Sequence, residues 1–230
     1  YHCNAADGIF TEITCEGSPI VGVSSLFEDS EGYLWIAACE HGLYRYDIKT
    51  GAMVFYSQGS LYYANTVFKD ISGTLWIGTW GKGLLRISDP YSHGELEYAC
   101  YTHGSDPSSL MDDVVYDINE DLSGRLWIAS RSGLSILSDP QQGTSFENYA
   151  PGQTDSGIPY NEVSSIIRTK NGKMWLSMYC GGVCKVQTPE PYCRVNYLDG
   201  LRKHLKTSSV RSMYQAAENK FWLGIIGYGM

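Results

Sequence analysis

The chain has 230 residues, of which 43% are hydrophobic and only 18% are charged, together with 25 glycines and 18 tyrosines. This composition excludes a disordered chain, a coiled coil and a collagen, and it favours a soluble all-β fold. The formal net charge of −8 argues against nucleic acid as a partner. No apolar run approaches the roughly 18 residues that a membrane span needs, so we expect no direct membrane insertion by this segment.

One phrase recurs five times along the chain, and each copy contains a tryptophan. The first three copies follow the pattern Asp-x-x-Gly-x-Leu-Trp-Ile, whereas Thr169 and Ala216 replace the aspartate in the last two. The five tryptophans are separated by 41, 51, 48 and 47 residues. A repeat of that period is typical of the four-stranded blades of a β-propeller. The copies span residues 29–36, 70–77, 121–128, 169–176 and 216–223, and their tryptophans are Trp35, Trp76, Trp127, Trp175 and Trp222.

Each copy is predicted to form four short antiparallel strands. The first strand carries apolar residues at a spacing of three, such as Val23 and Leu26, and leads into the Asp-x-x-Gly turn. In that turn the aspartate caps backbone amides and the glycine supplies a positive φ. The Leu-Trp-Ile run is a second strand buried on both faces, and a third strand and an outer fourth strand follow it. We expect full blades at 20–58, 59–102, 110–150 and 158–198, a partial blade at 207–230, and the outer strand of a preceding blade within 1–19.

Two arrangements of these blades remain open. A leading outer strand and an end inside the fifth copy favour a fragment of a larger ring. Alternatively, residues 9–14 complete the fifth blade and close a five-bladed ring.

The repeat resembles a known family. Asp-x-x-Gly-x-Leu-Trp-Ile-Gly-Thr, followed by Gly-Leu-x-Arg-Tyr-Asp, is similar to the two-component regulator propeller repeat, most clearly in residues 67–87 and 23–47. The resemblance implies the periplasmic sensor region of a hybrid two-component system from a Bacteroides-like bacterium. It also implies a seven-bladed ring, followed by an immunoglobulin-like domain, a membrane span and a histidine kinase. The expected ligand is an oligosaccharide from a complex glycan, the neighbouring domains of the same polypeptide are expected partners, and a homodimer stays open.

Loop residues near the repeated tryptophans are the candidates for a ligand site. Trp80 lies four residues after Trp76, and its counterparts in the other copies vary in chemistry, as solvent-facing positions do. In a propeller, these loops and the segments that enter each blade share one face around the channel mouth. Aromatic rings that stack on sugars and polar groups that bind hydroxyls, carboxylates or sulfates suit such a site. The predicted ligand-binding residues are Glu40, His41, Tyr62, Trp80, Lys82, Asp113, Arg131, Asn161 and Tyr179.

Other chemistries find less support in the sequence. The five histidines show no metal-ligand spacing with one another or with cysteine, so we expect no metal and no cofactor. No Gly-x-Ser-x-Gly elbow is present, and we expect no enzyme activity from this segment. Two alternative functions stay open, namely a protein-interaction scaffold and a propeller-fold polysaccharide lyase or hydrolase.

The cysteines leave the redox state open. Their number, seven, is odd, so at least one has no disulfide partner within the chain. Cys184 and Cys193 flank a short turn and are the predicted pair for a disulfide, with buried thiols as the alternative.

Overall fold

A computed structural model describes residues 2–3, 8–152, 158–187, 194–197, 209–217 and 220–226. Four four-stranded antiparallel sheets follow one another along the chain, and a two-stranded sheet comes last. One 3-10 helix, η1 (Gly59–Tyr63), precedes the second sheet. The first two sheets are β5 (Val23–Glu28), β6 (Tyr33–Ala38), β7 (Gly42–Asp47) and β8 (Met53–Tyr56), and then β9 (Ala64–Lys69), β10 (Leu75–Thr79), β11 (Leu84–Ile87) and β12 (Ala99–Tyr101). The other sheets are β13 (Val115–Glu120), β14 (Leu126–Ser130), β15 (Gly133–Leu137) and β16 (Phe146–Tyr149), then β17 (Val163–Arg168), β18 (Met174–Met178), β19 (Gly182–Gln187) and β20 (Arg194–Tyr197), and finally β21 (Val210–Ala217) and β22 (Lys220–Ile225).

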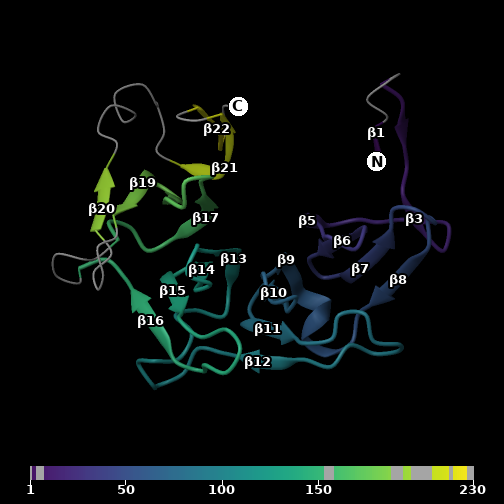
Figure 1. The fold of residues 1–230 in the computed structure, drawn as a ribbon, viewed down its shortest axis with the longest axis horizontal. Coiled ribbons are helices and arrows are strands. Elements are labelled where there is room, and N and C mark those ends of the chain that lie inside the picture. Colours follow the sequence, from purple (N-terminus) through teal and green to yellow (C-terminus); the bar gives the residue numbers. More distant parts are fainter. Residues whose placement is uncertain are drawn as a thin grey trace.

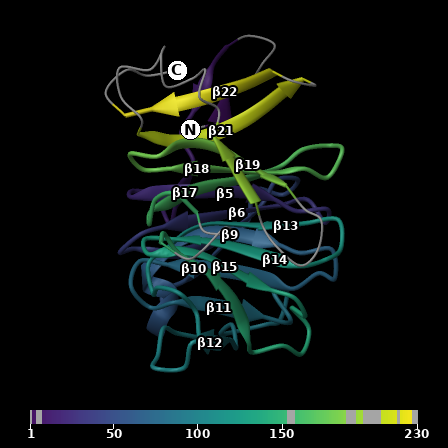
Figure 2. The same cartoon turned by 90° about the vertical axis from the view of Figure 1, so that its left-hand side faces the viewer.

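The sheets are the blades of a β-propeller, which confirms the predicted fold class. Figure 1 shows them side by side in an open arc, and Figure 2 shows the strands of successive blades in layers. The first strand of each blade lies innermost, because these strands contact one another in sequence, and the fourth strand lies at the outer edge. An arc of this kind fits part of a larger propeller.

The segment before the first blade forms two short antiparallel pairs. There β1 (His2–Cys3) pairs with β2 (Phe10–Thr11), and β3 (Thr14–Cys15) pairs with β4 (Ser18–Pro19) across a tight turn at Glu16 and Gly17, with φ of 51° and 79°. Among the described residues, no pairing joins residues 9–14 to β21 or β22, so the five-bladed alternative finds no support there.

The repeated tryptophans fill the space between neighbouring blades. Trp35, Trp76 and Trp127 are at most 1% exposed, and each packs with apolar residues of the blade that follows. Trp222 is 59% exposed, because no following blade covers it in the part of the chain that the structure describes. The prediction of a second strand buried on both faces therefore holds for three copies and is wrong for the fifth.

At the opposite end of the arc, apolar residues of the first strand of the first blade are likewise exposed. Val23 and Leu26 of β5 are 46% and 60% exposed, whereas their counterparts Val115 and Ile118 are 0% and 3% exposed. The apolar positions of a first strand are thus buried by the blade before it.

The Asp-x-x-Gly turn is built as predicted, and it also holds the tryptophan. Asp70 Oδ1 accepts hydrogen bonds from the backbone N–H groups of Ser72 and Thr74, both at 3.0 Å, and Gly73 has a φ of 93°. Asp70 Oδ2 accepts from Trp76 Nε1 at 2.8 Å. Asp29 and Asp121 make the equivalent bonds to their own turns and tryptophans.

In the fourth copy the turn is capped, but the hydrogen bond to the tryptophan is missing. Thr169 Oγ1 accepts from the Lys173 N–H at 3.0 Å and so caps the turn. Trp175 Nε1 is buried and finds no hydrogen-bond partner among the described residues. A threonine has a single side-chain oxygen, and its side chain is too short for that oxygen to accept hydrogen bonds from both the turn N–H and the indole N–H.

A β-bulge interrupts the first strand of every blade. The register between the first and second strands skips one residue, which is left out of the ladder and re-aimed. Four of these residues reach the next blade. Ser24 Oγ donates to the Asn65 carbonyl at 2.6 Å, and Asn65 Nδ2 donates to the Val115 carbonyl at 2.8 Å. Ser164 Oγ donates to the Val210 carbonyl at 2.6 Å, and the Tyr116 hydroxyl donates to Glu162 Oε1 at 2.7 Å. The bulge residues are Ser24, Asn65, Tyr116, Ser164 and Arg211.

Candidate functional site

One repeated hydrogen bond brings the predicted loops onto a single face. In every copy, the N–H of the residue after the second strand donates to the carbonyl of the residue before the first strand. We call the surface formed by these joined loops and the bulge residues beside them the channel mouth. The bonds are Cys39 to Gly22 at 3.0 Å, Trp80 to Tyr63 at 2.9 Å, Arg131 to Val114 at 3.2 Å, Tyr179 to Glu162 at 2.9 Å and Ile226 to Ser209 at 3.2 Å.

Three predicted aromatic residues are exposed at the channel mouth. Trp80 is 44% exposed, Tyr62 is 40% exposed and Tyr179 is 37% exposed. The Trp80 ring lies 5.8 Å from the ring of Tyr116, and the Tyr62 ring lies 5.1 Å edge-on to the ring of Tyr63. Apolar ring surface is therefore open to solvent on this face, unlike that of the inter-blade tryptophans.

Tyr116 lies at the centre of this group, although it was not among the predicted residues. Its hydroxyl donates to Glu162 Oε1 at 2.7 Å, a bond from the third blade to the fourth. Burial raises the pKa of Tyr116, and the hydrogen bond to Glu162 raises it further, against the opposing charges of Arg131 and Arg211. The phenol therefore stays protonated and acts as a hydrogen-bond donor.

Arg131 is held in place by a buried carboxylate. Its Nε lies 3.3 Å from Asp112 Oδ2, and its side chain is 62% exposed. Asp112 also accepts from the Val114 N–H at 2.8 Å and from the Ser132 hydroxyl. The guanidinium is thus anchored on one side and open to solvent on the other.

Asp113 positions a loop instead of presenting a free carboxylate. Its Oδ1 accepts from the His103 N–H at 2.7 Å, and its carbonyl accepts from the N–H groups of Gly81 and Gly83 at 3.0 and 2.9 Å. Gly83 is required there, since a Cβ would lie 2.1 Å from the Tyr101 carbonyl oxygen. The loop that Asp113 anchors carries Trp80 and also Lys82, whose Nζ lies 5.2 Å above the Tyr63 ring.

The predicted residues thus fall into four groups. Trp80, Arg131 and Tyr179 surround Tyr116 and Glu162, while Tyr62 and Lys82 adjoin Tyr63. Asp113 has a positioning role. The other three predicted residues, Glu40, His41 and Asn161, are exposed, and among the described residues they make no contact with these groups. The His41 ring lies close to Gly22.

The predicted disulfide stays a prediction. Cys184 is buried, and the register of β19 with β20 places Tyr197 opposite it. Cys193 lies outside the described residues. Among the residues described, no cluster of three potential metal ligands occurs. Within the same residues, no helix has the length and apolarity needed to cross a membrane.

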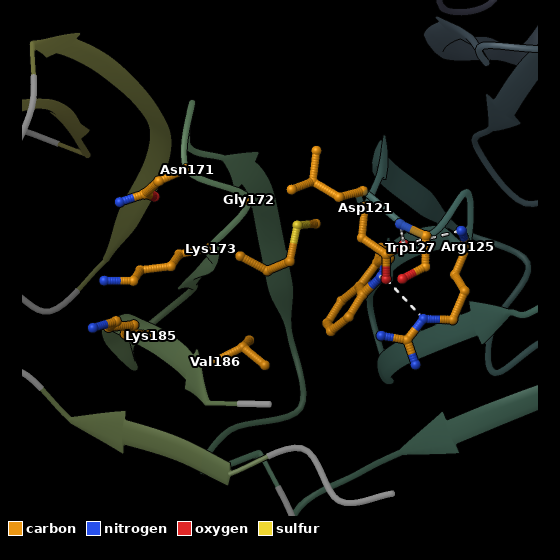
Figure 3. Close-up of a pocket in the computed structure, with 11 residues that line it drawn as sticks. Asp121, Arg125, Trp127, Asn171, Gly172, Lys173, Lys185 and Val186 are labelled. Atoms are coloured by element: carbon orange, nitrogen blue, oxygen red, sulfur yellow. Dashed lines mark hydrogen bonds and ion pairs between the residues drawn. The ribbon is translucent and has the colours of Figure 1, made fainter. Parts of the chain in front are cut away.

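A groove of about 470 Å³ lies between the third and fourth blades, near the Asp-x-x-Gly turns (Figure 3). Trp127 and Arg125 border it on one side, where Asp121 accepts from Trp127 Nε1 at 2.9 Å and from Arg125 Nε at 2.7 Å. Lys173 and Lys185 lie on the other side.

This groove is not the best candidate for a ligand site. At the two preceding blade boundaries, a residue from the loop between the third and fourth strands contacts the equivalent turn. Tyr91 donates to Asp29 Oδ2 at 2.6 Å, and Gln141 donates to the Ser72 hydroxyl. The corresponding loop of the fourth blade, 188–193, lies outside the described residues, so the open groove carries no functional argument.

Comparisons with known proteins agree with this architecture. Residues 17–39 match the family described as two component regulator propeller. The chain therefore carries a two-component regulator propeller repeat. No curated protein matches the chain.

Several solved structures share the fold. The extracellular domain assigned to the hybrid two component system BT3049 of B. thetaiotaomicron has a TM-score of 0.69 and 21% identity, over 90% of this chain and 28% of that one. PorZ, a surface component of the type-IX secretion system of Porphyromonas gingivalis, has a TM-score of 0.68 and 14% identity, over 98% of this chain and 33% of that one. Virginiamycin B lyase from Staphylococcus aureus has a TM-score of 0.63 and 13% identity, over 88% of this chain and 63% of that one. At these identities the likeness is one of fold, and this chain spans under a third of the length of the first two.

Proposed function

We propose that this propeller segment is the periplasmic, non-catalytic sensor domain of a two-component signalling protein. In this proposal it binds an oligosaccharide at the channel mouth and passes the binding event to a histidine kinase in another part of the protein. The observation that carries the proposal is the exposed ring surface of Trp80, Tyr62 and Tyr179 beside Arg131 on one face. The matched repeat and the extracellular two-component neighbour support the sensor role.

The chemistry of these side chains suits a sugar. An aromatic ring stacks on the C–H face of a pyranose, while forked donors pair with its hydroxyl or acidic groups. Trp80 supplies a ring that is 44% exposed, and Arg131 supplies donors that Asp112 leaves free. Tyr116 supplies a rigid ring behind Trp80 at 5.8 Å.

The mouth is preorganised for binding. Backbone hydrogen bonds join each loop to the strand beside it, and Asp112 and Asp113 fix the Arg131 side chain and the Trp80 loop. A ligand therefore loses little free energy to ordering these loops, which favours affinity.

Binding without catalysis is the interpretation that the titratable groups support. A tyrosine that acts as a general base needs a lowered pKa, whereas burial and Glu162 raise the pKa of Tyr116. Asp112 and Asp113 each accept hydrogen bonds that fix neighbouring groups, so neither is placed to move a proton on a substrate.

Signalling would follow from a population shift. A ligand that contacts Trp80 of the second blade, Arg131 of the third and Tyr179 of the fourth favours the arrangement in which these groups are closest. Only the difference in affinity between two arrangements is transmitted to the rest of the protein.

Calorimetric titration of the full-length protein with a panel of neutral and acidic oligosaccharides tests the proposal. We expect at least one to bind, Trp80→Ala to weaken that binding by on the order of tenfold or more, and chromatography to recover the sugar uncleaved. Phe55→Ala is the matched control, because Phe55 is also 44% exposed but lies on the outer strand β8. An unchanged affinity in Trp80→Ala, or cleavage of the sugar, would contradict the proposal.

A further inference from the structure

We infer that the ligand of the channel mouth is an acidic oligosaccharide, one that carries carboxylate or sulfate groups. The inference rests on the proposed function, since it takes the mouth to be a sugar site and adds the charge of the sugar. It follows from which charged side chains at the mouth already have partners and which do not.

Two carboxylates in the third blade are already engaged. Asp112 accepts from Arg131 Nε, the Ser132 hydroxyl and a backbone N–H, and Asp113 accepts from the His103 N–H at 2.7 Å. Arg131 balances the charge of Asp112, and a backbone N–H occupies one oxygen of Asp113, so both carboxylates are already committed to hydrogen bonds within the protein.

The carboxylate of the fourth blade is engaged as well. Glu162 accepts the hydroxyl hydrogen of Tyr116 at 2.7 Å. Glu40 is the remaining acidic candidate at the mouth, and it belongs to the first blade, whereas Trp80 and Tyr116 belong to the second and third.

The cations at the mouth, in contrast, have unused capacity. Lys82 and Arg211 are exposed, and neither is within ion-pair distance of a carboxylate among the described residues. Lys82 Nζ lies 5.2 Å above the Tyr63 ring, and within the described part of the chain it has no carboxylate partner. Arg131 uses Nε on Asp112, which leaves the two terminal nitrogens of its guanidinium to donate elsewhere.

These cations lie near the aromatic residues of the channel mouth. Lys82 lies on the same loop as Trp80, and Arg131 and Arg211 are both near enough to Tyr116 to counter the rise in its pKa. Arg211 is the bulge residue of β21, next to Val210, whose carbonyl accepts from Ser164 Oγ at 2.6 Å. The second, third and fifth blades thus each contribute one cation to the channel mouth, with Lys82 above the Tyr63 ring and Arg131 and Arg211 near Tyr116.

The overall negative charge of the chain does not oppose this inference. The net charge of −8 is spread over the whole molecule, and at physiological ionic strength charges farther than about 8 Å are largely screened. An acidic group stacked at Trp80 would therefore respond mainly to the charged groups of the mouth itself, where Lys82, Arg131 and Arg211 have donors that no carboxylate among the described residues occupies. Guanidinium groups bind carboxylate and sulfate through paired, charge-assisted hydrogen bonds.

Matched pairs of sugars that differ only in charge provide the test. One arm compares oligogalacturonides with their methyl esters, and the other compares sulfated galactan oligosaccharides, which contain no uronic acid, with their desulfated forms, each titrated into the full-length protein. We expect a member of one arm to bind, with the acidic form on the order of tenfold tighter than its neutral partner. The arm that binds identifies carboxylate or sulfate as the recognised group. The advantage of the acidic form should shrink as salt rises to about 0.5 M.

Three variants tie the effect to the mouth. Lys82→Met and Arg211→Met should each weaken binding of the acidic sugar by on the order of tenfold, and should weaken binding of the neutral partner by less. Lys49→Met, which removes a cation from the turn between β7 and β8, should change neither.

Equal affinity for the acidic and neutral forms, or unchanged affinity in Lys82→Met and Arg211→Met, would overturn the inference and leave the proposed sugar site standing. Failure of every sugar in both arms to bind would overturn the inference, and if the wider neutral panel also failed, the proposed function would fall with it.

Discussion

Tyr91 of the second blade donates its hydroxyl hydrogen to Asp29 Oδ2 of the first blade at 2.6 Å. The same oxygen accepts from Trp35 Nε1 at 2.8 Å, while Asp29 Oδ1 caps the turn. One carboxylate therefore links the turn, the repeated tryptophan and the neighbouring blade. Each repeat is thus coupled to the next by polar bonds in addition to apolar packing.

Removing the Tyr91 hydroxyl should loosen this boundary. Tyr91→Phe loses the bonds to Asp29 and Glu31 and the one from Lys69 at 2.7 Å, while keeping the ring in place. We expect the free energy of unfolding to fall by about 1–2 kcal/mol, measured by urea denaturation. Tyr33→Phe is the control, and we expect it to be close to neutral. Equal stability of the two variants would contradict the role given to the Tyr91 hydroxyl.

The fourth repeat can be repaired. Thr169→Asp places a second oxygen within reach of Trp175 Nε1, which is buried with no hydrogen-bond partner among the described residues. By analogy with Asp70 and Trp76, at 2.8 Å, we expect the free energy of unfolding to rise by about 1 kcal/mol. Thr169→Val, which loses the turn cap, should lower it. A loss of stability in Thr169→Asp would show that the indole is not available to the new carboxylate.

The raised pKa of Asp117 should make the free energy of unfolding depend on pH. Its Oδ2 accepts from the Ile166 N–H of the next blade at 2.7 Å, and burial raises its pKa to about 6. Because the pKa of Asp117 in the folded protein exceeds the ordinary value of 3.8 for an aspartate, the folded state holds the proton more tightly. This contribution to stability is therefore fully present below pH 3.8 and is lost as the pH rises through about 6.

The loss over that pH range should be on the order of 3 kcal/mol. Urea denaturation gives the free energy of unfolding of the protein and of Asp117→Asn at several pH values between about 4 and 7. The difference between these two free energies at each pH measures the contribution of Asp117. We expect that difference to change with pH in the stated direction. A difference that is constant with pH would contradict the raised pKa.

Gly78 marks a close approach between two blades. A Cβ there would lie 2.5 Å from Thr66 Cγ2 and 2.5 Å from Val115 Cγ1. We therefore expect Gly78→Ala to destabilise the fold by about 1–3 kcal/mol, because neither neighbour is free to move. Gly104→Ala, whose Cβ would have no atom closer than 3.8 Å, should be close to neutral in the same thermal-unfolding assay.

The fold could be predicted because each repeat carries its own local signals. The Asp-x-x-Gly turn and the Leu-Trp-Ile run recur in register, so blade number, strand order and turn chemistry could be inferred without knowing any contact. Burial of Trp222 was predicted wrongly, because it depends on a neighbouring blade and not on the repeat that contains it. The hairpin at Glu16 and Gly17 was missed; Gly17 was the available signal, because glycine readily adopts the positive φ of 79° found there, whereas Glu16 gives none.

The candidate site was predicted only in part. Trp80 and Arg131 could be found because they occupy the position four residues after the repeated tryptophan, where the residue type differs from copy to copy. Tyr116 and Glu162 were missed, because a β-bulge re-aims Tyr116 out of the first strand. A bulge depends on strand register, which is set by pairing with the second strand and not by local sequence. The variable residue after the apolar opener of each first strand was the available signal.

Hydrogen–deuterium exchange of the full-length protein, with and without an oligosaccharide that binds it, tests the central claim most directly. If the ligand lies across the channel mouth, amide exchange should slow in residues 80–83, 131–132 and 179–181, and the turns at 122–125 and 171–173 should not change. Protection confined to those turns, or spread evenly over all blades, would contradict a site at the channel mouth.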